Sequence, residues 1–217
     1  MRGFTLIELM VVVILIGILS VLAIPAMTTA QTDRRSYDDA ISVAELFREA
    51  KTRAMGRGAA ELIAMTQVGG FGGGDRGTFL LYEGQVMSAP PIGVAPIGSP
   101  MSTCGAPTVW TGPAKTAVLI DGINLNGPIE ATDGIWTTIT APLFGGGVGV
   151  TNAAYLCFTP LGRTYYSNGA GAPNFISGSP MLGEIQIALA HTYNGAAAGI
   201  VRTVVVPNSG ATRIISH

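Results

Sequence analysis

The feature that most constrains this chain is a long uncharged, apolar run close to its N-terminus. No charged residue occurs from Leu9 to Thr32, and most positions are Leu, Ile, Val, Ala or Met. At about 1.5 Å of rise per residue, the roughly 19 residues of Leu9–Met27 are just long enough to cross the apolar core of a bilayer as a helix. Arg2 precedes the run and polar sequence follows it, so the positive-inside bias predicts a cytoplasmic N-terminus and an exported remainder.

Glu8 distinguishes this run from a plain membrane anchor. An unpaired carboxylate at the edge of the apolar core costs roughly 2.5–3.5 kcal/mol, so a cationic partner is expected. If the chain were cut between Gly3 and Phe4, the new α-amino group would be cationic and could pair with Glu8 of a neighbouring copy. Two simpler interpretations remain. A secretory signal peptide would have a poor cleavage site in Ala23-Ile24-Pro25-Ala26, and a single-span anchor would have no use for Glu8.

The N-terminus resembles the signature of type IV prepilins and type II secretion pseudopilins, through Gly3-Phe4-Thr5-Leu6-Ile7-Glu8 and the apolar helix that follows. The resemblance implies that a prepilin peptidase cuts after Gly3 and methylates Phe4, and that Glu8 is used in filament assembly. It also implies a break in the helix near Gly17 and Pro25. The leader of three residues is shorter than most in the family, so either the peptidase accepts it or the true start lies upstream.

The pattern beyond the apolar run is also helical. From Asp33 to Met55 apolar residues recur at three- and four-residue spacing, with charged residues on the other face and a C-cap at Gly56-Arg57-Gly58. Acidic and basic residues alternate on that face, which favours a solvated, salt-bridged surface over a phosphate-binding stripe. We expect one helix from about Thr5 to Met55, bent near Pro25. Its expected inward residues are Tyr37, Ala40, Ile41, Ala44, Phe47, Ala50 and Ala54. The expected segments are a leader (1–3), a hydrophobic membrane or filament-core helix (4–27), its amphipathic half (28–56) and a β-rich head (57–217).

The remainder of the chain has the composition of a β-rich domain. Only 12 % of the 217 residues are charged, against about 25 % in an average domain, and there are 30 glycines and 13 prolines. Short β-type runs alternate with turn signals, which favours sheets packed on the helix. We expect an α+β fold, in which the long N-terminal helix packs on a β-sandwich or antiparallel sheets. The strand candidates are residues 60–67, 78–82, 117–120, 136–140, 153–158, 183–190 and 200–207. Residues 84–107 are expected to form an inserted surface loop with little to bury.

The two cysteines, Cys104 and Cys157, both follow the apolar run. In an oxidising compartment this pair predicts one disulfide that closes a loop of about 50 residues. By the chain-entropy account such a bridge contributes roughly 4 kcal/mol of stability. Two buried free thiols remain the alternative.

No set of side chains in the sequence points to catalysis. The two histidines, His191 and His217, have neither a neighbouring metal-ligand pattern nor a nucleophile and carboxylate to form a triad. Asp121, Glu130 and Asp133 lie in turn-like sequence, where a carboxylate usually caps a loop. We therefore expect no enzyme activity, no cofactor and no metal site.

The rest of the chain resembles the minor pilin and pseudopilin class named after GspH, FimT and FimU. The similar segments are Arg48–Ala54 at the helix end, Cys157–Arg163 with an apolar-x-Pro-x-Gly turn, and Thr203–Val206 followed by Gly210–Ile214 as a closing hairpin. This resemblance implies a minor pilin, a structural subunit that primes assembly of a type IV pilus or sits at its tip. Residues 84–107 and 142–150 depart from the compact family pattern, which leaves the number and order of strands open.

The resemblance also implies partners and a location. The partners are other minor pilins, the major pilin, a tip adhesin and the prepilin peptidase. The inner membrane holds the precursor with its head in the periplasm, and the mature protein lies in a pilus or pseudopilus. One alternative is a GspH-like minor pseudopilin of a type II secretion system. Another is a DNA-binding competence pilin, but Arg202 and Arg213 are isolated, whereas binding to phosphates needs several cations. Nucleic acid is therefore not expected as a partner.

Overall fold

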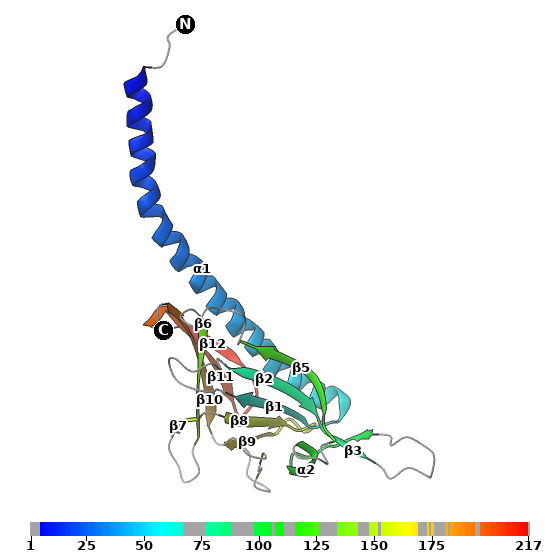
Figure 1. Cartoon of the computed structure of the whole chain (residues 1–217). Coiled ribbons are helices and arrows are strands. Elements are labelled where there is room, and N and C mark those ends of the chain that lie inside the picture. Colours follow the sequence, from blue (N-terminus) through cyan, green and yellow to red (C-terminus); the bar gives the residue numbers. More distant parts are fainter. Residues whose placement is uncertain are drawn as a thin grey trace.

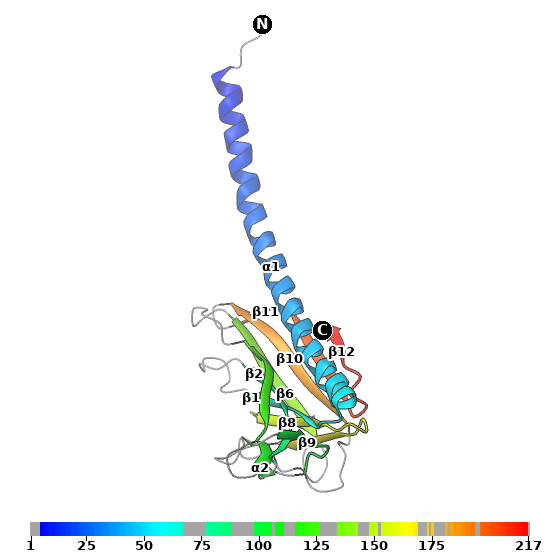
Figure 2. The ribbon, with the colours of Figure 1, turned by 90° about the vertical axis from the view of Figure 1, so that its right-hand side faces the viewer.

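The structure is a computed structural model of the chain. It describes residues 5–66, 77–87, 98–105, 107–110, 116–125, 134–142, 148–151, 153–168, 173, 175, 181, 183–193 and 196–216. One long helix, α1 (Leu6–Arg57), lies against a β-rich head with its C-terminal half, and its N-terminal half projects away from the head (Figures 1 and 2). We call the projecting part, residues 6–32, the arm.

The head is built from two five-stranded sheets in which all neighbouring strands are antiparallel. The first sheet has the order β5-β2-β1-β8-β9 and the second has the order β12-β11-β10-β6-β7. The strands of the first sheet are β1 (Glu61–Thr66), β2 (Thr78–Glu83), β5 (Val118–Asn124), β8 (Ala153–Phe158) and β9 (Thr164–Asn168). Those of the second sheet are β6 (Gly134–Pro142), β7 (Val148–Thr151), β10 (Glu184–Tyr193), β11 (Ala196–Pro207) and β12 (Arg213–Ser216). A small hairpin of β3 (Gln85–Met87) and β4 (Gly98–Pro100) and a short helix, α2 (Pro107–Trp110), complete the described elements.

Both ends of α1 are capped by residues suited to the task. Thr5 is the N-cap, and Gly58 ends the helix in the left-handed region with φ 69°, a conformation that costs glycine little. The helix runs without interruption past Gly17 and Pro25. The break expected near these two residues concerns the assembled filament and stays a prediction.

One hydrophobic core joins α1 to both sheets. The helix contributes alanines, which let both sheets approach it closely, together with larger side chains such as Phe47. The strands contribute mainly Ile, Leu, Val and Phe. Alternate residues of each strand point into this core, so the first sheet uses the positions of Ile63, Phe79 and Leu156. The helix residues in the core are Ala40, Val43, Ala44, Leu46, Phe47, Ala50 and Ala54.

The expected inward face of the helix was wrong at one position. Tyr37 is 45 % exposed, because it lies at the edge of the head, where the guanidinium of Arg202 lies 5.4 Å from its ring centroid. Ile41 is only half-buried, and Val43 and Leu46 are fully inside although the spacing argument omitted them. The wider apolar stripe follows from packing against two sheets rather than one.

A second, smaller core lies on the other face of the first sheet. The chain between β2 and β5 folds over this face and buries Met101, Cys104 and Trp110 against Leu62 and Cys157. The expectation that residues 84–107 have little to bury was therefore wrong. The disulfide expected between Cys104 and Cys157 is present, with its Cα atoms 6.1 Å apart, and the indole Nε1 of Trp110 donates a hydrogen bond to the carbonyl oxygen of Cys104 at 3.2 Å.

All seven strand candidates correspond to strands, namely β1, β2, β5, β6, β8, β10 and β11, with shifted ends. The elements β3, β4, β7, β9 and α2 were not expected. The strand β9 was missed because Thr164–Asn168 is a polar and tyrosine-rich segment, in which Tyr165 and Tyr166 pack against opposite faces of the sheet. The closing hairpin is present as β11 paired with β12.

Candidate assembly surface on the N-terminal helix

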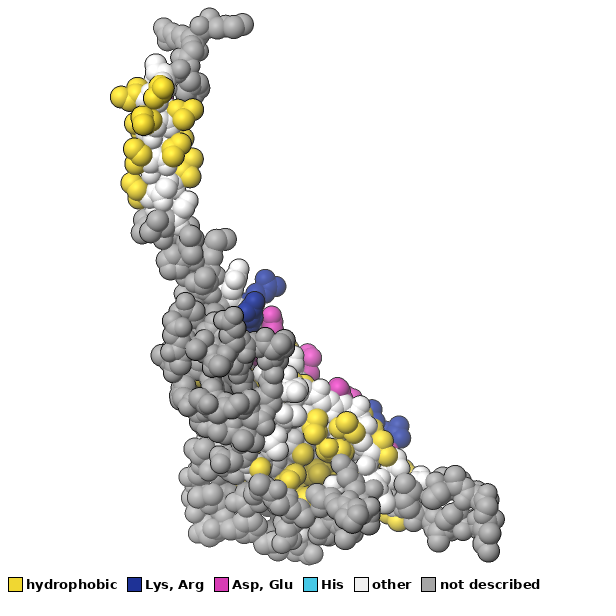
Figure 3. All heavy atoms as spheres, viewed as in Figure 1, with side chains coloured by type: hydrophobic (Ala, Val, Ile, Leu, Met, Phe, Trp, Pro, Cys, Tyr) yellow, Lys and Arg dark blue, Asp and Glu magenta, His cyan; other side chains and the backbone are white. Residues whose placement is uncertain are grey.

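The arm carries apolar side chains on all its sides and buries none of those described. Every large apolar side chain from Leu6 to Leu19 is between 48 % and 78 % exposed, and Figure 3 shows them covering the end of the helix. A helix that is apolar all round requires an apolar environment on every side, such as lipid or a bundle of other helices. In the described part of the chain no segment folds back to supply that environment. The arm is therefore a surface suited to burial by something outside this chain.

Glu8 is the one charged residue on the described arm, and Thr5 holds it. The backbone N–H and the hydroxyl of Thr5 donate to Oε2 of Glu8 at 3.0 and 2.9 Å, and the backbone N–H of Glu8 donates to Oγ1 of Thr5 at 3.4 Å. This reciprocal arrangement is a capping box, which satisfies donors that the first helical turn leaves unpaired. Oε1 of Glu8 accepts no hydrogen bond from the described residues, so it is available to a further cation.

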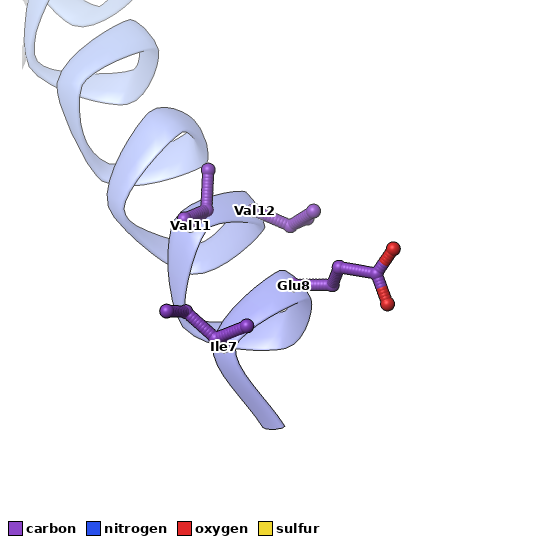
Figure 4. Close-up of a pocket in the computed structure, with 4 residues that line it drawn as sticks. All are labelled: Ile7, Glu8, Val11 and Val12. Atoms are coloured by element: carbon purple, nitrogen blue, oxygen red, sulfur yellow. The ribbon is translucent and has the colours of Figure 1, made fainter. Parts of the chain in front are cut away.

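The surroundings of Glu8 are apolar. Ile7, Val11 and Val12 line a shallow hollow together with Glu8, and Figure 4 shows the carboxylate extending outward from the helix beside Val12. A carboxylate in such surroundings becomes costly once the arm is covered, unless a cation comes with the covering surface. The geometry thus favours a partner surface that has apolar side chains and one positive charge placed next to Glu8.

Thr5 is a functional candidate that the sequence argument did not single out. The signal was present as Thr5-Leu6-Ile7-Glu8, the T-x-x-E pattern of a capping box immediately before an apolar run. Gly3 and Phe4, the expected processing pair, lie outside the described residues. The backbone of α1 places Gly17 and Pro25 in the arm, and a Cβ atom on Gly17 would meet no neighbour within 4 Å.

A second polar cluster lies where α1 ends. Glu61 is fully buried, and its Oε1 lies 3.6 Å from Nε of Arg53. Oε2 of Glu83 lies 2.6 Å from Nε of Arg57 and 3.5 Å from an outer nitrogen of Arg53. We call these four residues the helix-end cluster. Burial raises the pKa of Glu61 to about 7, Arg53 opposes that rise, and the charge of Glu83 adds to it. With two carboxyl groups against two guanidinium groups, the cluster ties the last turn of the helix to β1 and β2.

The remaining candidates from the sequence have structural contacts. His191 is buried in β10. Burial and the nearby charge of Asp38 raise the pKa of Asp39 on α1, and Arg35 and His191 partly offset this rise. Oδ1 of Asp121 accepts a hydrogen bond from the backbone N–H of Gly122 at 2.7 Å. Glu130, Asp133 and His217 lie outside the described residues. Among the described residues no group of three His, Cys, Asp or Glu side chains is placed to hold a metal ion.

The two C-terminal arginines are both engaged within the head. Arg202 contacts Tyr37 and donates to Oγ of Ser216, and Arg213 lies 3.2 Å from a carboxylate oxygen of Glu184. This arrangement gives the DNA-binding alternative no support.

A comparison with known families identifies the N-terminus. Residues 1–24 match the family model described as the prokaryotic N-terminal methylation motif. No curated protein and no solved structure matches the chain significantly. The match covers Glu8 and the start of the arm but none of the head, so the GspH, FimT and FimU class stays a prediction. Within the described residues, no helix has both the length and the sustained apolar character needed to span a membrane.

Proposed function

Because the chain carries the N-terminal signature of type IV prepilins and pseudopilins, we propose that it is a structural subunit of a type IV pilus, and within that class a minor pilin that primes assembly or sits at the tip. The observation that carries the proposal is the exposed arm, which is apolar on every side with one capped carboxylate in its first turn. An arm of this kind serves assembly into a helical bundle and has no evident use in an isolated globular protein.

Assembly of such a subunit is a transfer between two apolar environments. The precursor is held in the inner membrane by its N-terminal apolar run, with the head in the periplasm, and the prepilin peptidase cuts after Gly3. The arm then leaves lipid for a bundle of similar helices. Since lipid tails and neighbouring Leu, Ile and Val side chains are similarly apolar, this step changes the free energy little.

The position of each subunit then depends on a directional contact. The new α-amino group of Phe4 on one subunit approaches the open Oε1 of Glu8 on another. At 4 Å and an effective dielectric constant of 20, opposite unit charges attract by about 4 kcal/mol. A shift of one helical turn would separate the charges and leave both in apolar surroundings, so this pair would specify one register. The Glu8→Leu variant should therefore fail to assemble although its arm is more apolar.

The proposed partners are other minor pilins, the major pilin and a tip adhesin. The main alternative is a minor pseudopilin of a type II secretion system, because that class shares the same N-terminal signature. The two functions differ in the proteins found beside this one.

The experiment that tests the proposal is affinity capture of the epitope-tagged protein from sheared surface filaments, followed by mass spectrometry of its N-terminus and of co-purified proteins. A methylated Phe4 N-terminus together with major and minor pilins is the expected result. Secretion-pathway partners without pilins would favour the pseudopilin. An uncut Met1 N-terminus confined to the inner membrane would overturn the filament role.

A further inference from the structure

The turn between β8 and β9 carries a large apolar side chain that nothing in the described chain covers. Leu161 is 86 % exposed, more than any other large hydrophobic side chain that the structure describes, those of the arm included. A Cβ atom on the next residue, Gly162, would meet no neighbour within 4 Å, so the turn stands clear of the head. A single exposed leucine is common on protein surfaces and indicates nothing by itself. What distinguishes Leu161 is how the chain holds it and what lies beside it.

The turn is held in one conformation. Pro160 has its φ fixed by its ring, and Gly162 lies in the left-handed region at φ 76°. The backbone N–H of Gly162 donates to the carbonyl oxygen of Thr159 at 2.9 Å, and the N–H of Thr159 donates to that of Arg163 at 2.9 Å. Oγ1 of Thr159 also accepts from the N–H of Arg163 at 3.2 Å. Because the turn is already ordered, binding through Leu161 costs little conformational entropy.

The turn lies at the end of the head where α1 ends. It follows Phe158, which is paired with Glu61 at the start of β1. The connection between β11 and β12 also reaches this place, since a Cβ atom on Gly210 would lie 3.0 Å from the ring of Phe158 and 2.9 Å from the stem of Lys51. Figure 2 shows the turn and this connection beside the C-terminal end of α1. Three segments that are distant in the sequence thus form one surface, at the opposite end of α1 from the arm.

This surface combines exposed apolar side chains with positive charge. Met55, one helical turn beyond Lys51, is 50 % exposed. Lys51 donates to the carbonyl oxygen of Ser209, and Arg163 is exposed. Within the described part of the chain, no carboxylate lies within 4 Å of either cation. We call Lys51, Met55, Leu161 and Arg163 the end face.

The chemistry and position of the end face exclude three kinds of occupant. Two cations are too few for a nucleic acid, whose phosphates need several. A membrane is excluded because the end face lies at the opposite end of α1 from the arm that enters it. A second copy of this chain offers an apolar hollow with a carboxylate beside Glu8, but lipid or other helices cover that hollow in the proposed function.

We propose that the end face docks the head of a different filament subunit, which receives Leu161 in an apolar pocket and places a carboxylate at the rim of that pocket against Arg163. The proposal rests on the filament role proposed above. It adds a contact in water, at the far end of the head, that is independent of Glu8 and the arm. A preorganised apolar anchor beside a charge that the partner completes is the usual composition of the centre of an interface.

The first part of the test identifies the occupant. A photo-crosslinking side chain is introduced into the full-length protein as Leu161→p-benzoylphenylalanine, and sheared filaments are irradiated and analysed by mass spectrometry. The expected result is a crosslink to one other subunit, at a site with apolar residues and an Asp or Glu. The same substitution at Leu119 is the matched control, because Leu119 is 54 % exposed but lies on β5, at the opposite edge of the first sheet. It should not crosslink to that site.

The second part tests the two contacts. Leu161→Ser and Arg163→Glu should each lower co-capture of the crosslinked subunit by about tenfold or more, as expected for residues at the centre of an interface. Changing the carboxylate of that subunit to Lys should restore capture by Arg163→Glu, because the charges are opposite again. Leu119→Ser and Arg163→Lys should capture like the parent. Formation of the Cys104–Cys157 disulfide in every variant reports an intact head.

The outcomes separate this proposal from the filament role. If the parent enters filaments but position 161 forms no crosslink, the end-face proposal is wrong and the filament role stands. The same holds if position 161 crosslinks to a second copy of this chain, or if Leu161→Ser captures like the parent. If the parent never enters filaments, both proposals fail.

Discussion

Glu61 on β1 lies directly opposite Glu83 on β2, so two carboxyl groups are held side by side beneath the C-terminal end of α1. Like charges opposite each other on neighbouring strands destabilise a sheet. Here Arg53 and Arg57 face them from the last turns of the helix, and each carboxyl group has a guanidinium group within 4 Å. The join between the helix and the first sheet thus depends on four ionisable groups, two of which, on Glu61 and Glu83, are buried.

The first prediction concerns pH. Burial raises the pKa of Glu61 from 4.5 to about 7, so the folded protein binds a proton that the unfolded chain releases at lower pH. The stability that this proton provides is complete below pH 4.5 and is lost as the pH rises through 7. Glu61→Gln has no carboxyl group at this position, so it should keep its stability while the parent loses its own. The free energy of unfolding of the variant minus that of the parent should therefore increase by on the order of 2–3 kcal/mol from pH 5 to pH 8. Chemical denaturation of the full-length protein in detergent measures it. Glu184→Gln, at an exposed ion pair, is the control, and a difference independent of pH would contradict the prediction.

The second prediction concerns Arg53, which contacts Glu49, Glu61 and Glu83. Arg53→Met keeps the apolar stem but leaves buried carboxyl charge uncompensated, which costs about 3–5 kcal/mol of stability. The loss should be larger at pH 8 than at pH 5, because Glu61 is neutral at the lower pH. Arg34→Met removes an exposed arginine and should change stability by less than about 0.5 kcal/mol. Equal losses from the two substitutions would show that the helix-end cluster is not a centre of stability.

The third prediction concerns the disulfide. Cys104 and Cys157 are 53 residues apart, so the chain-entropy account predicts a loss of about 4 kcal/mol when the bridge is removed. Cys104→Ser/Cys157→Ser should lower stability by this order. Trp110 packs in the same cluster, so its fluorescence should shift to the red as the second core loosens. A reduced parent with unchanged fluorescence and stability would show that the second core holds without the bridge.

The fourth prediction concerns Thr5. Thr5→Val removes the hydroxyl that shares the capping box with Glu8, and the loss of an N-cap costs about 0.5–2 kcal/mol. The arm should fray at its first turn, and incorporation into filaments should fall while the stability of the head is unchanged. Thr5→Ser restores the hydroxyl and should assemble like the parent. Equal incorporation of Thr5→Val and Thr5→Ser would mean that the cap has no part in presenting Glu8.

The helix could be predicted almost completely from the sequence, because its signals are local. The apolar run, the repeat from Asp33 to Met55 and the glycines after it gave ends within two residues of Leu6 and Arg57. Tyr37 was misplaced because spacing alone does not tell where the head begins. Asp33 contacts the head through its carboxylate, which accepts a hydrogen bond from the backbone N–H of Ile200, and only the fold brings these two residues together.

The sequence predicted the strands in which apolar and polar side chains alternate or apolar residues predominate. It did not predict strands that form only because of contacts with distant parts of the fold. β8 and β11 are rich in buried apolar residues, whereas β9 has a polar sequence and exists because the turn at Gly162 returns it beside β8. The helix-end cluster could not be predicted, since Glu61 and Glu83 are separated by 22 positions and look like ordinary surface carboxylates. Glu8 could be recognised from the sequence alone, because it is a charged residue directly beside a long apolar run.

The uninterrupted course of α1 has a mechanical consequence. As one helix of 52 residues, it is a rod about 78 Å long. Among the described side chains, contacts with the head run from Asp33 to Arg57, so the projecting arm is similar in length to the part of the helix that is held on the head. A sideways force on the tip of the arm makes the helix pivot near Asp33. This rotation pulls the end of the helix at Arg57 away from the sheet. A pull along the axis instead shears every contact between the helix and the head at once, and this is the direction in which the protein resists force best.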